Sequence, residues 1–177
     1  MRIGLFYGSS TCYTEIAAEK IQAEFAEQQL DMFNIKDCDV QQMTDYPVLS
    51  LGISTWDYGE LQEDWEAVWD NLEGLDLQNK TIALFGLGDQ IGYSEWFLDA
   101  MGMLFEQLAP SGANFIGFWP NQGYEFEASK ALTEDGEYFF GLALDDENQY
   151  DLSDQRIAQW CAQLKQELKE FSLDFQR

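Results

Sequence analysis

The sequence predicts one α/β domain over residues 1–177, built as a doubly wound parallel sheet with helices on both faces. Three observations lead to this fold class. The chain has 177 residues, enough for one sizeable core and too few for two. Its short apolar runs are mostly continuous, as in strands buried on both faces. Segments with a helical apolar period alternate with these runs, which is typical of a parallel sheet with crossover helices.

The expected strands are the apolar runs in chain order. The runs of strand length are residues 3–7, 30–35, 48–53, 81–87, 115–119 and 138–144. The second of them is the weakest. The last two flank residues 120–137, which are rich in Asn, Gly, Asp and Glu and show little regular pattern. We interpret this stretch as an inserted surface loop.

Helices are expected where apolar residues recur every three or four positions. The segments with this pattern are residues 17–25, 65–72, 97–108 and 153–171. Trp65 and Trp69 share one face of the second segment, so we expect them to be packing residues. The last segment is the clearest, because Ser153 has the chemistry of an N-cap and apolar residues follow it at helical spacing up to Phe171.

The composition is that of a folded, strongly acidic protein. Hydrophobic residues make up 46% and aromatic residues 15% of the chain, which argues against disorder despite a formal net charge of −24. A field of this sign repels nucleic acid and anionic membranes, and it attracts basic protein surfaces in a salt-dependent way. We therefore expect no nucleic-acid or membrane partner.

Several kinds of chemistry are excluded. The chain has no histidine, which rules out a Ser-His-Asp triad and a His-ligated metal. Cys12, Cys38 and Cys161 show no CxxC spacing, so neither a disulfide framework nor a zinc site is indicated. No apolar run approaches the roughly 18 residues of a membrane span, and the early first strand leaves no room for a signal peptide. We expect a cytoplasmic protein whose chemistry comes from a bound group.

The loop after the first strand is rich in hydroxyl groups. Its residues are Ser9, Ser10, Thr11, Cys12, Tyr13 and Thr14, and a helix is expected to start here. Hydroxyls and backbone N–H groups at a helix N-terminus can converge on one anion. Because the loop has no Lys or Arg, a triphosphate loop of the GK[ST] type does not fit, and a phosphate monoester is the better match. The alternative is a Ser/Thr-rich N-cap that binds nothing.

Two further loops follow expected strands and contain aromatic residues. The loop after residues 48–53 consists of Ser54, Thr55, Trp56, Asp57, Tyr58 and Gly59. In this polar turn the Trp56 ring is exposed unless something flat covers it, or unless it folds back over the core. The loop that ends the next strand contains Leu87, Gly88, Asp89 and Tyr93. Its glycines allow close approach of a ligand, Asp89 offers an acceptor and Tyr93 offers a second aromatic face.

Four stretches of the sequence resemble the long-chain bacterial flavodoxin family, nearest to its flavodoxin 2 branch. They are GLFYGSSTCYTE, STWDYGELQEDWE, GLGDQIGY and GLALDDENQYDLSDQRI, and the resemblance covers essentially the whole chain. It implies a flavodoxin-like five-stranded parallel sheet of order 2-1-3-4-5, with the last strand interrupted by the long-chain insert at about 120–137. It also implies a low-potential carrier of single electrons with non-covalently bound FMN, and not an enzyme.

The resemblance assigns roles to the three loops. Residues 9–14 match the phosphate loop of the family, and Trp56 and Tyr93 match the two aromatic residues that enclose the flavin ring. Gly88 and Asp89 match the loop at the pyrimidine edge of the ring. The peptide between Asp57 and Tyr58 matches the one whose carbonyl turns toward flavin N5 on reduction.

Two residues depart from the family pattern in the phosphate loop. Cys12 stands where the family usually has Gly, and Tyr13 where it usually has Asn or Lys. We expect a cysteine to be tolerated only if its φ is negative and its sulfur points away from the phosphate. Cys12 could be a redox-sensitive thiol, although a nearby phosphate dianion would oppose a lowered thiol pKa; the alternative is a neutral packing residue.

The resemblance also implies partners. These are basic redox proteins, such as a ferredoxin/flavodoxin–NADP reductase, and electron-accepting enzymes, with the chain itself as a monomer. Residues 37–99 contain 14 Asp or Glu and one basic residue, Lys80, so this segment is either a dock for such proteins or a solvated acidic surface. The insert either recognises partners, as the apolar Tyr124 and Phe126 suggest, or is a passive elaboration.

An FMN-dependent NAD(P)H quinone or nitro reductase on the same fold is the main alternative function. Two observations count against it. The sequence offers no basic patch for a dinucleotide phosphate, and Trp56 and Tyr93 are expected to cover both ring faces. A phosphoacceptor signalling domain is a weaker alternative, because the first strand ends in GSST and not in an acidic pair.

Overall fold

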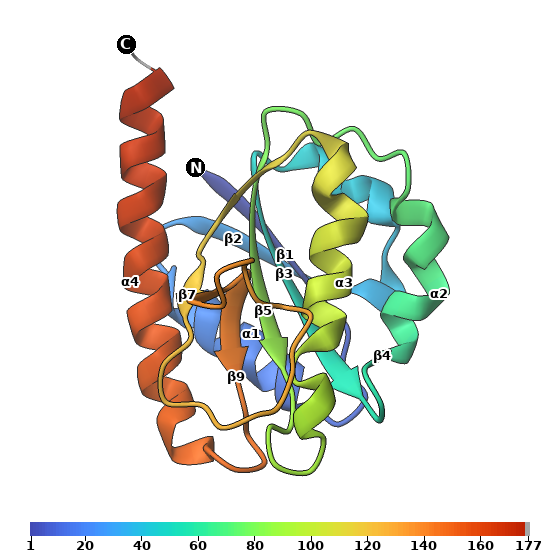
Figure 1. The fold of residues 1–177 in the computed structure, drawn as a ribbon. Coiled ribbons are helices and arrows are strands. Elements are labelled where there is room, and N and C mark those ends of the chain that lie inside the picture. Colours follow the sequence, from blue (N-terminus) through green and yellow to red (C-terminus); the bar gives the residue numbers. More distant parts are fainter. Residues whose placement is uncertain (176–177) are drawn as a thin grey trace.

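The computed structural model describes residues 1–175, and it has the alternating strand–helix order that the sequence predicts (Figure 1). The strands are β1 (Arg2–Tyr7), β2 (Gln29–Asn34), β3 (Val48–Trp56), β4 (Glu60–Leu61), β5 (Thr81–Leu87), β6 (Asn114–Ile116), β7 (Trp119–Pro120), β8 (Tyr138–Phe139) and β9 (Gly141–Leu144). The helices are α1 (Tyr13–Glu24), α2 (Glu63–Leu72), α3 (Asp99–Leu108) and α4 (Tyr150–Phe175). Short 3-10 helices cover Ile35–Asp37, Val40–Asp45, Ser94–Trp96 and Ala109–Ser111.

The main sheet is parallel and has the order β2–β1–β3–β5, with a divided strand beyond β5. In that last position β6 pairs with residues 81–83 of β5, and β9 pairs with residues 84–87. Two short strands thus take the place of one, and the chain between them forms the insert. The expected order 2-1-3-4-5 and the interruption of the last strand are confirmed. The sequence did not predict β4, which forms an antiparallel hairpin with the end of β3.

The sheet separates two apolar cores. The core on one face includes Trp65 of α2 and residues of α3, and the core on the other includes Trp160 of α4 and residues of α1. Figure 1 shows α4 and the α2–α3 pair on opposite sides of the sheet. Both indoles are fully buried, and each Nε1 donates a 2.8 Å hydrogen bond to a backbone carbonyl, of Gly52 and Gly117 respectively. Each indole therefore buries a large apolar surface while its one polar atom keeps a hydrogen bond, and this fixes α2 and α4 against the two faces of the sheet.

The insert at 120–137 is held at its base by β7 and β8, which pair antiparallel. Its aromatic residues face inward. The Phe126 ring lies 5.1 Å from that of Phe97, and the Tyr124 ring lies 5.3 Å from that of Phe139. Both rings pack against the core, which accounts for these apolar residues without a partner, and a partner role for the insert stays a prediction.

The last helix starts earlier than predicted. α4 begins at Tyr150, so Ser153 lies inside its first turn and is not the N-cap. The chain is already turning before this point, since Gln149 N donates to Asp145 O and Leu152 N donates to Gln149 O. The buried Ser153 hydroxyl donates instead to the carboxylate of Asp146. Among residues 1–175, none of the helices combines the length and the apolar character needed to cross a membrane.

Candidate functional site

Three loops meet at the carboxyl edge of the sheet around a cavity of about 250 Å³. They follow β1, β3 and β5, so the parallel pairing of these strands brings them together. The lining residues are Thr11, Tyr13, Thr14, Ser54, Thr55, Trp56, Asp57, Leu87, Gly88, Tyr93, Asp146 and Glu147. The predicted site residues outside this lining are Ser9, Ser10, Cys12, Tyr58, Gly59 and Asp89. Ten of the sixteen predicted residues thus surround one cavity.

The first loop presents the N-terminus of α1 without a side-chain cap. The helix begins at Tyr13, and the residue at the N-cap position, Cys12, makes no capping hydrogen bond with its side chain. The N–H groups of the first turn therefore keep their capacity to bind a ligand. The Ser9 hydroxyl oxygen is buried and has no hydrogen-bond partner among the described residues. An orphaned hydroxyl next to an uncapped helix end is the arrangement that an anion would satisfy.

Cys12 does not have the backbone conformation expected from its residue type. Its φ is 68°, in the left-handed region, and not negative as expected. The turn from β1 into α1 needs this conformation, which glycine adopts freely and which a residue with a Cβ adopts at about 1–2 kcal/mol. The side chain is exposed and lies outside the cavity lining, so the thiol is free but does not enter the site.

Ser10 is tied to the start of α2. Its hydroxyl accepts a 3.0 Å hydrogen bond from Gln62 Nε2, while Gln62 Oε1 caps α2 by accepting from the N–H groups of Asp64 and Trp65. A Cβ at Gly8 would lie 2.1 Å from Gln62 Oε1, so only glycine fits against this side chain. Gln62 is thus a supporting residue of the first loop that sequence reasoning missed.

Each of the other two loops contributes one aromatic side chain to the cavity lining, which also includes Tyr13 of the first loop. Trp56 ends β3, and its Nε1 donates a 3.0 Å hydrogen bond to Ser54 Oγ. The alternative that this indole joins an apolar core is wrong, since it packs in neither of the two clusters. Tyr93 is 38% exposed. Its backbone N–H donates a hydrogen bond to Asp89 O, which closes the turn between these two residues. Tyr58 lies outside the cavity, edge-on to Tyr93 at 6.2 Å.

The comparisons with known proteins identify the family. The family model described as Flavodoxin matches residues 5–160. The chain belongs to the flavodoxin family. It is 57% identical over 170 residues to Flavodoxin 2 of Escherichia coli K12, covering 96% of this chain and 98% of the relative. It is 46% identical to the flavodoxin of Synechococcus elongatus, covering 94% and 97%. A crystal structure of Fusobacterium nucleatum flavodoxin bound to flavin mononucleotide superposes with a TM-score of 0.88 at 31% identity, covering 94% and 98%.

In this flavodoxin the Asp89 side chain does not point an acceptor into the cavity. Its Oδ1 accepts hydrogen bonds from the N–H groups of Ile91 and Gly92, at 3.1 and 2.7 Å, and from Asn148 Nδ2 at 2.7 Å. Asp89 therefore shapes the loop, and it is the backbone at Gly88 that lines the cavity. Asp89 lies outside the cavity lining and its own turn uses Oδ1, so a contact between its carboxylate and a ligand stays a prediction from the family resemblance.

Asp146 and Glu147 complete the cavity and were missed by sequence reasoning. They follow β9, and the strand predicted at 138–144 was a sufficient signal, because its carboxyl end lies at the same edge of the sheet. Burial raises the pKa of Asp146, although the Ser153 hydroxyl and Lys20 act in the opposite direction. The lining has two carboxylates at this side and no Lys or Arg, so only dipoles among the lining groups could attract an anion here.

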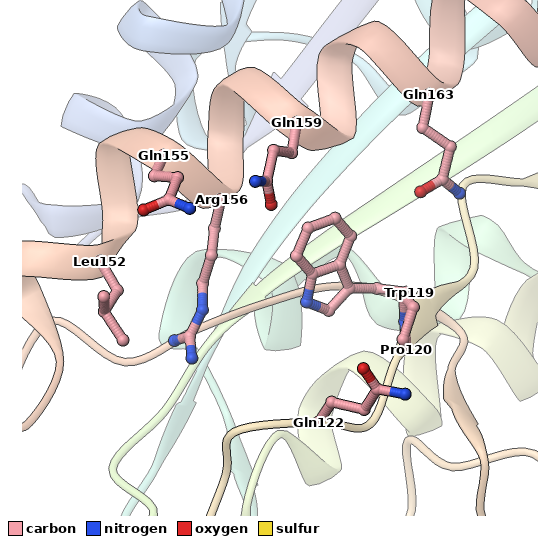
Figure 2. Close-up of a pocket in the computed structure, with 8 residues that line it drawn as sticks. All are labelled: Trp119, Pro120, Gln122, Leu152, Gln155, Arg156, Gln159 and Gln163. Carbon is pink, nitrogen blue, oxygen red and sulfur yellow. The ribbon is translucent and has the colours of Figure 1, made fainter.

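A second cavity, of about 430 Å³, lies between α4 and the start of the insert, and none of the predicted site residues lines it. Figure 2 shows glutamines of α4 along one side and Trp119 with Pro120 on the other. Within the described part of the chain, no group of three or more Cys, Asp or Glu side chains is placed to hold a metal ion. The first cavity is therefore the one around which the predicted site residues gather.

Proposed function

We propose that this flavodoxin carries single electrons at low potential, with FMN bound non-covalently in the cavity that Thr11, Trp56 and Tyr93 line. The observation that carries the proposal is the buried, unpartnered Ser9 hydroxyl beside the uncapped N-terminus of α1. Ser9 lies just outside the cavity lining, but Thr11 and Thr14 of the same loop belong to it, together with Trp56 and Tyr93. The similar flavodoxin of Fusobacterium nucleatum was crystallised with flavin mononucleotide bound, which supports the same ligand here.

The residues present fit each part of FMN. The hydroxyls and first-turn N–H groups of residues 9–14 would hold the phosphate, and the rings of Trp56 and Tyr93 would cover the flavin. Bound FMN supplies the one-electron chemistry, while the protein orients it and excludes water. The Asp57 carbonyl oxygen would accept a hydrogen bond from flavin N5–H after its peptide has turned, as the family resemblance implies.

Electron transfer, and not catalysis of a substrate reaction, is the function of the family to which the chain belongs. A quinone or nitro reductase needs one flavin face open to a hydride donor. Walls contributed by Trp56 and Tyr93 leave little room for a nicotinamide, which disfavours this alternative.

The partners of such a carrier are other redox proteins. We extend this to basic ones, because exposed carboxylates flank the loops at the cavity, among them Asp57, Glu60 and Glu95. Complementary charge gives fast, weak and salt-sensitive encounters, which suit a shuttle. The acidic segment 37–99 would then be the docking face for a reductase and for acceptors.

The test begins with the visible absorption spectrum of the purified protein and with titration of its apoprotein by FMN. A flavin spectrum and saturable binding are expected, whereas a colourless protein that does not take up FMN contradicts the proposal. Turnover of NADPH and quinone without an added reductase should be absent, and its presence would favour the reductase alternative. Electron transfer from a flavodoxin reductase should slow as ionic strength rises; a rate insensitive to salt would remove the docking argument.

A further inference from the structure

The loop from Gly88 to Tyr93 is fastened to the rest of the protein at one buried carboxylate. Asp145 is the first residue after β9 and is fully buried. Among residues 1–175, no Lys or Arg forms an ion pair with it. Its oxygens accept hydrogen bonds from N–H groups instead. Gln90 donates two of these to Oδ2, from the main-chain N at 3.1 Å and from Nε2 at 2.8 Å.

The other donors to Asp145 come from its own turn. Glu147 N and Asn148 N donate to Oδ1 at 3.1 and 3.0 Å. The Asn148 side chain donates to the Asp145 carboxylate and also to Asp89 Oδ1, so it joins this turn to the 88–93 loop a second time. A buried carboxylate that is solvated only by N–H groups makes each of these bonds costly to lose.

Gln90 uses both ends of its carboxamide. While Nε2 donates to Asp145, Oε1 accepts a 2.6 Å hydrogen bond from the N–H of Glu125, in the insert. The side chain is 2% exposed, and the partners fix its orientation, because a flipped amide would set oxygen against carboxylate and NH₂ against N–H. Gln90 therefore links the 88–93 loop to the end of β9 and to the insert.

The insert is itself held in place by contacts with α4 and with the segment that follows Tyr93. Arg156 of α4 is buried at 8% exposure, donates to Gln149 Oε1 at 2.7 Å and lies 4.3 Å over the ring of Tyr124. Figure 2 shows its side chain extending from α4 on the side where Trp119 and Gln122 lie. On the other side, Ser94 O accepts hydrogen bonds from two insert N–H groups, at 2.9 and 3.0 Å. The insert is thus anchored both to α4 and to the segment that follows Tyr93.

We infer that Gln90 is a positioning residue for the flavin site: by bridging Asp145 and the insert it sets the place of the loop that presents Gly88 and Tyr93. Gln90 lies outside the cavity lining and acts only through these neighbours. The inference rests on the proposed function and gives the insert a role in that function. An insert fixed to α4 holds the loop at the spacing that a flat ring requires.

The first experiment compares Gln90→Met with Gln163→Met. Gln163 is a matched control, since its Nε2 also bridges two acceptors, Phe118 O and Glu167 Oε1, but away from the flavin cavity. Gln90→Met should weaken binding of FMN and of riboflavin by the same factor, roughly tenfold, the equivalent of one typical hydrogen bond. It should also change the visible circular dichroism of the bound flavin. Gln163→Met should leave both affinities within about twofold of wild type.

The second experiment distinguishes positioning from general packing. Gln90→Glu sets two carboxylates side by side and should weaken flavin binding more than Gln90→Met. Adding Asp145→Asn restores one carboxylate and one carboxamide in exchanged places, so the double variant should bind flavin better than Gln90→Glu alone. A merely structural role predicts additive losses from the two changes, and that result would overturn the inference.

A third readout does not depend on flavin. In the apoprotein, amide hydrogen exchange over residues 91–93 should be faster in Gln90→Met than in wild type, and unchanged in Gln163→Met. Faster exchange with unchanged flavin affinity would overturn the positioning role. If the wild-type protein bound no flavin at all, the proposed function would fail, whereas the exchange result would still report whether Gln90 fixes the loop.

Discussion

Replacing Ser9 by alanine tests the contribution of the phosphate to FMN affinity separately from the contribution of the flavin ring. Ser9 Oγ is buried near the N-terminus of α1 and has no hydrogen-bond partner within residues 1–175. In the apoprotein the change removes no bond within the protein, so the free energy of unfolding should stay within about 1 kcal/mol of wild type. In the FMN complex it removes one hydrogen bond to a charged group, about 1.5–3 kcal/mol. We therefore expect FMN to bind roughly 10- to 150-fold more weakly.

The assay is titration of each apoprotein with FMN and with riboflavin, followed by flavin fluorescence. Riboflavin lacks the phosphate, so its affinity should be the same for Ser9→Ala and wild type. Ser50→Ala is the matched control, because the Ser50 hydroxyl is also buried and unpartnered among the described residues but lies within β3 and not in the loop before α1. Equal weakening of both ligands by Ser9→Ala, or no weakening of FMN, would refute the assignment of this hydroxyl to the phosphate.

Four further outcomes follow from the same structure. Cys12→Gly removes the strain of a left-handed residue with a Cβ, which stabilises the fold by about 1–2 kcal/mol, whereas the greater freedom of glycine in the unfolded chain costs about 0.4–1 kcal/mol. Urea unfolding should therefore show a free energy of unfolding higher by about 0.5–1 kcal/mol. Cys12→Ala should show no such gain. Burial raises the pKa of Asp146, so ionisation above that pKa destabilises the fold; Asp146→Asn should raise the free energy of unfolding at pH 7 and lose this advantage as the pH falls through the folded pKa. Tyr124→Phe removes the hydroxyl that accepts a hydrogen bond from Trp119 Nε1 and donates one to Ala143 O. Calorimetry or urea unfolding should show a free energy of unfolding lower by about 1–3 kcal/mol. FMN affinity should rise with ionic strength, because salt screens the repulsion between a dianion and a chain of net charge −24, and a fall would contradict a phosphate site built from dipoles.

The layout of the site followed from the sequence because it depends on long-range features that are simple to recognise. Continuous apolar runs such as 48–53 and 81–87 indicate strands buried on both faces, and parallel strands bring their carboxyl ends to one edge. The loops that contain Trp56 and Tyr93 therefore had to meet there. The divided last strand is a different case, since only the family resemblance, and no periodicity, indicated that 115–119 and 138–144 share one position.

The structure differs from the expectations where a neighbouring backbone group decides what a polar side chain does. Asp89 was expected to offer an acceptor to a ligand, but it lies outside the cavity lining, and two N–H groups of its own turn and Asn148 bond to its Oδ1. Ser153 had the chemistry of an N-cap, but α4 already begins three residues before it, at Tyr150. At Cys12 the residue type predicted a negative φ, and the geometry of the turn into α1 prevailed over that preference. In each case the outcome depends on local geometry that residue type alone does not specify.

The absence of Lys and Arg from the cavity lining has a consequence for the redox function, and not only for binding. A cation placed roughly 10 Å from the flavin ring would stabilise an added negative charge by about 1.7 kcal/mol at an effective dielectric constant of about 20. This corresponds to a potential raised by about 70 mV. Hydroxyl and N–H dipoles bind a phosphate at short range, and their field falls off faster with distance than that of a full charge. Ser9 and the first turn of α1 can thus hold the dianion while the ring stays in a negative field that includes Asp146 and Glu147. A phosphate loop without a positive charge should therefore leave the potential about 70 mV lower than the same loop with a cation at that distance.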